Sequence, residues 1–225
     1  MNLYYEKQGL ELHLDEGLCN CLCVENPHIL REFSYNIWKQ SEGNEGDICV
    51  SLSGRPVNLE KESSVVFNPY SLGMNEKKIL SKIYTEMRDI GQNELYEQYS
   101  ELNGKLVSYV DELSQHIPYP IDYSLDMDLI QLFKLMNVKV EETEQGLAER
   151  MTSYFRLAHQ TMNTILFVLF YPGEYLDSLE LKMISEMLEL EHVFALAIER
   201  SDRHSFYKNS WIMDLDNCII DCSTN

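Results

Sequence analysis

A continuous alternation of helical and strand-forming patterns between Leu129 and Glu199 constrains the fold of this chain more than any other feature. Helices are predicted over Leu129 to Met136, Ala148 to Gln160 and Leu176 to Leu188, and strands over Val138 to Glu141, Thr164 to Tyr171 and His192 to Glu199. Strands joined through helices of this length pair in parallel, with right-handed crossovers. The run TILFVLFY is too continuously apolar to alternate between two faces, so we expect a central strand covered by helices on both sides. The sequence therefore predicts an α/β core with a mostly parallel sheet.

Cores of this class often hold nucleotides at their strand ends, and the loops here lack the residues for it. A phosphate-binding P-loop needs a glycine-rich turn followed by a lysine and a hydroxyl at the start of a helix. The nearest candidate is PYSLGMNEKK (Pro69 to Lys78), which follows a predicted strand over Ser63 to Asn68. It has a single glycine, Gly73, and no Gly-Lys-Ser/Thr sequence. The apolar strand ends in Tyr171 and Pro172, where a nucleotidase needs an acid for Mg²⁺. We interpret this as a nucleotidase-like core with a degenerate P-loop; an ordinary strand, turn and helix is the preferred explanation of the loop itself.

The region before this core also contains recognisable strand, helix and hairpin patterns. The N-terminal segment MNLYYEKQGLELHLDEG alternates like a strand, and Asn26-Pro27 has the pattern of an N-cap and first helical residue, for a helix ending near Gln40. A glycine-containing loop, Glu42 to Gly46, then leads to a hairpin predicted to turn at Ser53-Gly54.

Three of the six cysteines, Cys19, Cys21 and Cys23, occupy alternate positions of LCNCLCV. In a strand their sulfurs point to one face. Metal sites use tight turns such as C-x2-C, so we favour small buried core cysteines over zinc ligands. A cytosolic setting argues against structural disulfides, and Cys218 and Cys222 are left unassigned.

The pattern between Asn75 and His116 is almost wholly helical, with Gly91 and Gly104 as its only weak points. One kinked helix or two long helices are both compatible with it. The core is too small for all of these helical residues to pack against it. We therefore expect a helical arm over residues 75–125 and an α/β head formed by residues 1–74 and 126–225.

The composition, with 44% hydrophobic residues in 225, is that of a globular protein. The longest apolar run is too short to cross a membrane, and the N-terminus lacks a signal-peptide pattern. We therefore expect a cytoplasmic protein.

Three segments resemble a known family: LFKLMNVKVEE (Leu132 to Glu142), TILFVLFYPGEYLDSLELKMISEML (Thr164 to Leu188) and HVFALAIERSDR (His192 to Arg203). They resemble the Csn family of type II-A CRISPR adaptation proteins, small ring proteins that bind DNA ends. The resemblance implies a homotetrameric ring of α/β heads with helical legs, stabilised by Ca²⁺, that holds double-stranded DNA ends without sequence specificity in a lysine-lined hole. It also implies a part in spacer acquisition beside the integrase proteins and the RNA-guided effector nuclease, and no enzymatic activity.

The charge is unusual for a DNA-binding protein, because 18 basic and 37 acidic residues give a formal net charge of −19. A ring resolves the conflict if symmetry gathers a few lysines from each subunit in one channel. Lys134 and Lys139 lie in a segment that carries the resemblance and look like the family's channel lysines, although a solvated helix end and strand end explain them equally well. Weaker candidates for DNA binding are Lys77, Lys78, Lys39 and Lys105.

Calcium prefers several oxygen ligands, and two acidic groups supply candidates. The first group is Asp122, Asp126 and Asp128, and the second is Glu141, Glu142 and Glu144. They are expected to converge on one or two ions between head and arm. The simpler alternative is that Asp126 and Asp128 favour the N-terminus of the following helix.

Two other functional classes stay open. An acidic protein-interaction module without DNA binding is favoured by charge alone. A nucleotidase or nuclease would need a convergent acidic or metal site, for which the sequence has no matching motif.

Overall fold

The computed structural model describes residues 1–142 and 146–223, which form two compact units. The head unit combines Met1–Met74 with Thr143–Asn225, and the helical unit comprises Asn75–Glu142. The predicted boundary at residue 125 is therefore placed too early, since the helix after it belongs to the helical unit. No helix in the described ranges is both long and apolar enough to cross a membrane.

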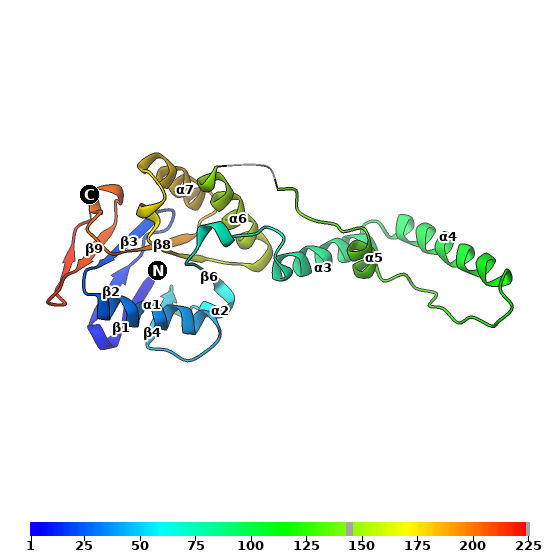
Figure 1. Ribbon diagram of the computed structural model, residues 1–225, viewed down its shortest axis with the longest axis horizontal. Helices are drawn as coiled ribbons and strands as arrows, with labels where there is room; N and C mark the ends of the chain where they lie inside the picture. The colour runs from blue at the N-terminus through cyan, green and yellow to red at the C-terminus, as the bar shows by residue number, and fades with distance from the viewer. Residues whose placement is uncertain (143–145, 224–225) are drawn as a thin grey trace. The chain divides into compact units, whose positions relative to one another are not determined.

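The head unit is built on a six-stranded sheet (Figure 1). In spatial order its strands are β10 (Ile219–Asp221), β9 (Ser210–Met213), β3 (Cys19–Val24), β8 (Phe194–Glu199), β7 (Leu166–Phe170) and β6 (Ser63–Val66). All neighbours pair in parallel except β10, which is antiparallel to β9. The predicted mostly parallel sheet is confirmed, and β7, buried at all five positions, lies between β6 and β8.

Two layers cover this sheet (Figure 1). Helices α6 (Leu147–Met162) and α7 (Ser178–Leu190) pack together on one face, where Phe155 of α6 stacks on Phe167 of β7 with ring centroids 4.3 Å apart. On the other face, α1 (Pro27–Ser41) and a second sheet share one apolar core with β3, β7 and β8. The predicted N-cap is confirmed, because the Asn26 side chain accepts a hydrogen bond from the His28 N–H.

The second sheet is antiparallel and was not predicted as a unit. Its strands, in spatial order, are β2 (Leu10–His13), β1 (Asn2–Tyr5), β4 (Ile48–Leu52) and β5 (Arg55–Pro56). The hairpin at Ser53-Gly54 is confirmed, with φ of 51° and 79° at these two residues, as a tight turn between twisted strands requires. Short elements complete the head: α2 (Leu59–Glu62), η1 (Glu6–Gln8), η2 (Pro69–Ser71), η3 (Pro172–Glu174) and η4 (His204–Phe206).

The three cysteines of β3 are buried and free, as predicted. Burial raises the pKa of both Cys19 and Cys23 to about 12, so these thiols stay protonated at neutral pH.

The helical unit contains α3 (Lys77–Asn93), α4 (Tyr96–Gln115) and α5 (Leu129–Leu135). The chain breaks at Leu95, whose backbone leaves the helical region, rather than at either glycine. Gly104 lies inside α4, and Gly91 allows close packing, since a Cβ there would lie 2.9 Å from Cδ1 of Leu129 in α5. Two long helices therefore replace the alternative of one kinked helix.

The strand predicted over Val138 to Glu141 is wrong. Val138 and Val140 are half-buried while Lys139 is exposed, which is the alternation that suggested a strand. Their backbone groups pair instead with side chains of the α3 region. The Tyr84 hydroxyl donates to the Val138 carbonyl at 2.7 Å, and the Asn75 side chain exchanges two hydrogen bonds with Val140.

Candidate nucleic-acid interface

The carboxyl ends of the parallel strands are the expected ligand-binding edge of such a sheet. One of these ends belongs to β3, an inner strand between β9 and β8 that leads directly into α1. The connecting turn is only Glu25-Asn26 before Pro27, which has no N–H to donate. The Asn26 side chain already occupies the His28 N–H at 3.0 Å. This turn therefore offers no cradle of free backbone N–H groups for a phosphate.

The loop considered from sequence, Pro69 to Lys78, follows the edge strand β6 and has the wrong polarity for an anion. The Arg150 guanidinium donates to the carbonyl oxygens of Tyr70 at 2.8 Å and of Leu72 at 2.6 Å. Carbonyl oxygens of this loop thus face a cation. The sequence placed the candidate at the wrong strand because strand order depends on long-range pairing, which the local pattern does not encode.

One acidic side chain does lie at a strand end, and it was missed from sequence. Glu199 ends β8 and is only 1% exposed. Its Oε1 accepts hydrogen bonds from the Gly173 N–H at 2.7 Å and from the Tyr207 hydroxyl at 2.8 Å. Burial raises the pKa of the Glu199 carboxyl, while these two hydrogen bonds lower it. The signal available in the sequence was the single acid that ends the apolar run VFALAIE.

The contacts of Glu199 tie β8 to the turn after β7 and to the segment before β9. A Cβ at Gly173 would lie 2.8 Å from Oε1 of Glu199, so glycine is needed for this close approach. In the described parts of the chain, no group of three or more histidine, cysteine or acidic side chains is placed to hold a metal ion. The hydrogen bonds from Gly173 and Tyr207 give Glu199 a structural role in linking these segments.

Among the described residues, the acidic residues predicted to bind Ca²⁺ form no group of three that could hold a metal ion. Asp128 caps α5 by accepting from the Ile130 and Gln131 N–H groups at 2.9 and 3.3 Å, as the simpler alternative held. Glu142 accepts a 2.8 Å hydrogen bond from the Asn75 side chain. Asp122, Asp126 and Glu141 lie in the same helical unit rather than between two units, and Glu144 lies outside the described residues. The described residues of a single chain thus do not fit a calcium ion.

Lysines, in contrast, concentrate in the helical unit. Lys77 and Lys78 open α3, and Lys82 follows one turn later; all three are exposed. Sequence reasoning missed Lys82, although its spacing of four from Lys78 places both on one side of a helix.

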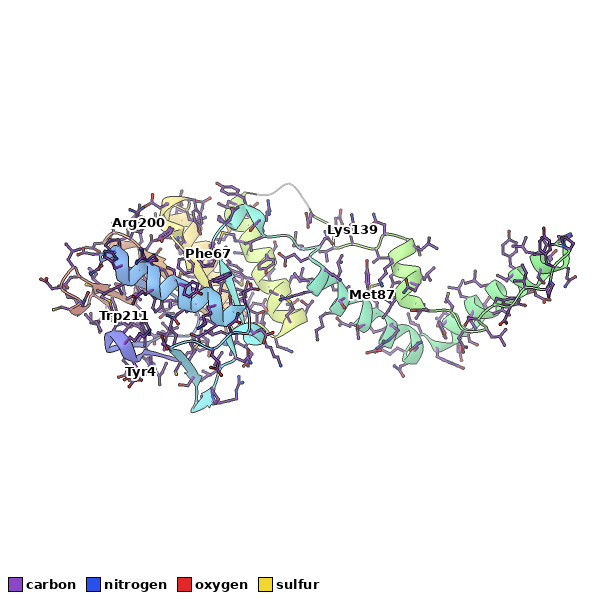
Figure 2. All side chains as sticks on the ribbon, turned by 60° about the horizontal axis from the view of Figure 1, so that its bottom comes forward. Tyr4, Phe67, Met87, Lys139, Arg200 and Trp211 are labelled. Carbon is purple, nitrogen blue, oxygen red and sulfur yellow. The ribbon has the colours of Figure 1, made fainter. Side chains whose placement is uncertain are left out.

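The chain after α5 runs back along α3 and adds two more lysines. Tyr84 and Phe133 bring α3 and α5 together, with ring centroids 5.8 Å apart, and Lys134 follows in the last turn of α5. Lys139 is exposed between the two anchored residues Val138 and Val140, and Figure 2 labels it on this extended segment. We call Lys77, Lys78, Lys82, Lys134 and Lys139 the lysine group.

No ion pair within the described ranges involves a member of the lysine group. The other two lysines predicted from sequence, Lys105 and Lys39, are not in the lysine group. Lys105 is paired with Glu101 one turn earlier on α4, and Lys39 lies at the end of α1 in the head unit. Four of the six predicted lysines therefore lie in the helical unit without an ion pair among the described residues, and Lys82 lies there too.

These features describe an α/β protein in which the turns after β3 and β6 offer no cradle for a phosphate, and in which five exposed lysines lie on the helical unit. The model of a family described as CRISPR-associated protein (Cas_Csn2) matches residues 40–217. The chain belongs to this Cas_Csn2 family, which confirms the resemblance found in the sequence. Membership implies a role in CRISPR adaptation. The family is not known for enzymatic activity.

Other comparisons are more distant. No curated protein matches the chain. A nucleotide-free ATP-binding cassette from an ABC transporter is 13% identical, with 96% of this chain and 85% of that chain covered and a TM-score of 0.47. A component of an ABC transporter complex from Clostridium perfringens is 11% identical over 91% of this chain and 76% of that chain, with a TM-score of 0.42.

Proposed function

We propose that this protein is a non-catalytic, ring-forming protein that binds double-stranded DNA ends, without sequence specificity, during CRISPR spacer acquisition. The observation that carries the proposal is the lysine group, five exposed lysines that form no ion pair with the described residues, in a chain of net charge −19. Unpaired lysines can replace the counterions of DNA phosphates, and this release supplies most of non-specific affinity. The nucleotidase-like interpretation of the head, with its degenerate P-loop, agrees with binding without catalysis.

Partner copies are part of the proposal. A single chain this acidic repels a polyanion, so a homotetrameric ring is proposed to gather the lysine groups while acidic surfaces face outward. The CRISPR integrase proteins and the RNA-guided effector nuclease are the proposed partners in the same process. Ca²⁺ is proposed to stabilise the ring, with ligands completed only in the assembly, because the described residues of one chain do not form its site.

The test is charge reversal within the lysine group. Lys134→Glu together with Lys139→Glu is expected to abolish binding of a short linear duplex at 0.1 M salt while the oligomeric mass stays unchanged. The wild-type salt dependence should also be steep, since each lysine that neutralises a phosphate adds about 0.9 to the slope of log K against log salt. Fluorescence anisotropy over a salt series measures both quantities.

The matched control reverses two exposed head lysines, Lys61 and Lys182, and changes the net charge by the same amount. This control should bind nearly as well as wild type. If the wild type binds no DNA at low salt with Ca²⁺, the proposal fails and the acidic protein-interaction module replaces it. If both double variants lose binding equally, the net charge rather than the lysine group is responsible.

A further inference from the structure

The turn that ends α5 exposes two large apolar side chains next to the lysines. Leu135 is 84% exposed, the highest value for a large hydrophobic side chain in the described part of the protein, and Met136 is 67% exposed. Lys134 directly precedes them and Lys139 follows three residues after Met136. We call Leu135 and Met136 the apolar tip.

The apolar tip is held in an ordered turn. The Met136 N–H donates to the Leu132 carbonyl at 2.9 Å, and the Val138 N–H donates to the Phe133 carbonyl at 3.0 Å. Asn137 adopts a left-handed conformation, with φ of 51°, which ends the helix as a C-terminal cap does. Contacts with α3 then fix both sides of the turn, through Phe133 before it and the Val138 carbonyl after it. The tip therefore projects from a rigid base.

The charge around the tip selects its partner. Between Asp128 and Glu141 the chain carries Lys134 and Lys139 and no acid, although 37 of its 225 residues are acidic. A partner that offers negative charge on both sides of an apolar surface is complementary to this segment. Duplex DNA has this arrangement at an open end, where two backbones flank the exposed face of the terminal base pair. Leucine and methionine are among the side chains that proteins insert against base steps.

An open end also removes the energetic obstacle to such a contact. Inside a duplex, an apolar wedge must first unstack a base step, which costs a few kcal/mol. The terminal base pair already exposes one face, so contact with it gains apolar burial without that cost. We infer that the apolar tip packs against the terminal base pair of a DNA end, while Lys134 and Lys139 contact the adjacent phosphates. This inference rests on the proposed function and adds to it a physical basis for preferring ends.

The test uses a blunt duplex with the fluorescent base 2-aminopurine in its terminal pair and a second duplex with the same base at its centre. Wild-type protein is expected to change the fluorescence of the terminal base only. Leu135→Ser together with Met136→Ser should remove this change and weaken binding of the open-ended duplex about tenfold, a loss of about 1.4 kcal/mol. Because both side chains are exposed, thermal unfolding of the variant should match that of wild type.

Two further measurements separate the possible failures. Leu190→Ser removes a 69% exposed leucine at the end of α7 and should leave binding and fluorescence unchanged. If wild type binds neither duplex, the proposed function itself fails. If the double serine variant keeps both its affinity and the terminal fluorescence change, only the tip contact is overturned. If that variant instead changes oligomeric mass in light scattering, the tip is an interface between copies of the chain and the inference is wrong.

Discussion

At the scale of single residues, Glu199 is a buried acid that the sequence analysis did not single out. Its carboxylate is enclosed at the end of β8, and one oxygen, Oε1, accepts both hydrogen bonds. Desolvation, the largest effect, raises its pKa. The folded protein thus binds this proton more tightly than the unfolded chain. The resulting stability is complete below the unfolded pKa and is lost as the pH rises through the folded pKa.

Glu199→Gln should therefore stabilise the protein above the folded pKa. The glutamine Oε1 can accept from both Gly173 and Tyr207, and no charge is buried. We expect a higher free energy of unfolding than that of wild type at pH 8 and no difference at pH 4. Urea unfolding across this pH range measures it. Glu11→Gln, at an exposed position of β2, is the control and should have no effect. Destabilisation at pH 8 would show that the ionised carboxylate is required.

Several residue-level features could be predicted because they depend on neighbours in sequence. Asn26 before Pro27 defines a helix start by its own side-chain chemistry, and Ser53-Gly54 defines a tight turn by its backbone preferences. The cysteines of β3 follow the period of a strand. Glu199 could not be found this way, because its donors come from residues 173 and 207, whose proximity exists only in the folded head.

At the scale of elements, α5 is short and depends on its cap. The seven-residue helix begins with two N–H groups satisfied by Asp128. Helices of this length are not stable alone, so this cap and the packing on α3 maintain the turn that carries the apolar tip.

Asp128→Ala should destabilise the helical unit by about 1 kcal/mol, while Asp128→Asn, which keeps an acceptor oxygen, should cost only a few tenths. Hydrogen exchange of the Ile130 and Gln131 amides measures this directly, because they lose their acceptor only in the alanine variant. If Asp128 is instead a metal ligand, Ca²⁺ should slow the exchange of these amides in wild type and leave the asparagine variant unchanged.

Elements were predictable where periodicity is strong, as in α6, α7 and β7. The segment over Val138 to Glu141 was mistaken for a strand because alternating burial arises from any extended chain lying on a surface. Its partner is a helix, and side chains of Tyr84 and Asn75 replace the backbone ladder. The arm boundary was misplaced for the same reason, since the packing of α5 on α3 is a long-range contact.

At the scale of the whole molecule, the proposed ring has a direct test. Size-exclusion chromatography with light scattering should give four copies of the 26.3 kDa chain in Ca²⁺ and a smaller species after chelation. The tetramer should retain linear duplex and not closed circular duplex, because a closed circle offers no end to thread through the ring. A monomer or dimer that binds neither DNA would support the interaction-module alternative.

The sequence by itself determined the α/β class, most helices and strands, the buried cysteines and the family resemblance, because these follow from local propensity and periodic burial. Only the tertiary structure decided that β3 is an inner strand and β6 an edge strand, that Glu199 is enclosed, and that α5 joins the helical unit. It also assigned Lys134 and Lys139 to the same unit as Lys77, Lys78 and Lys82. The physical reason is that strand order and helix packing are set by contacts between residues far apart in the chain, which no local pattern records.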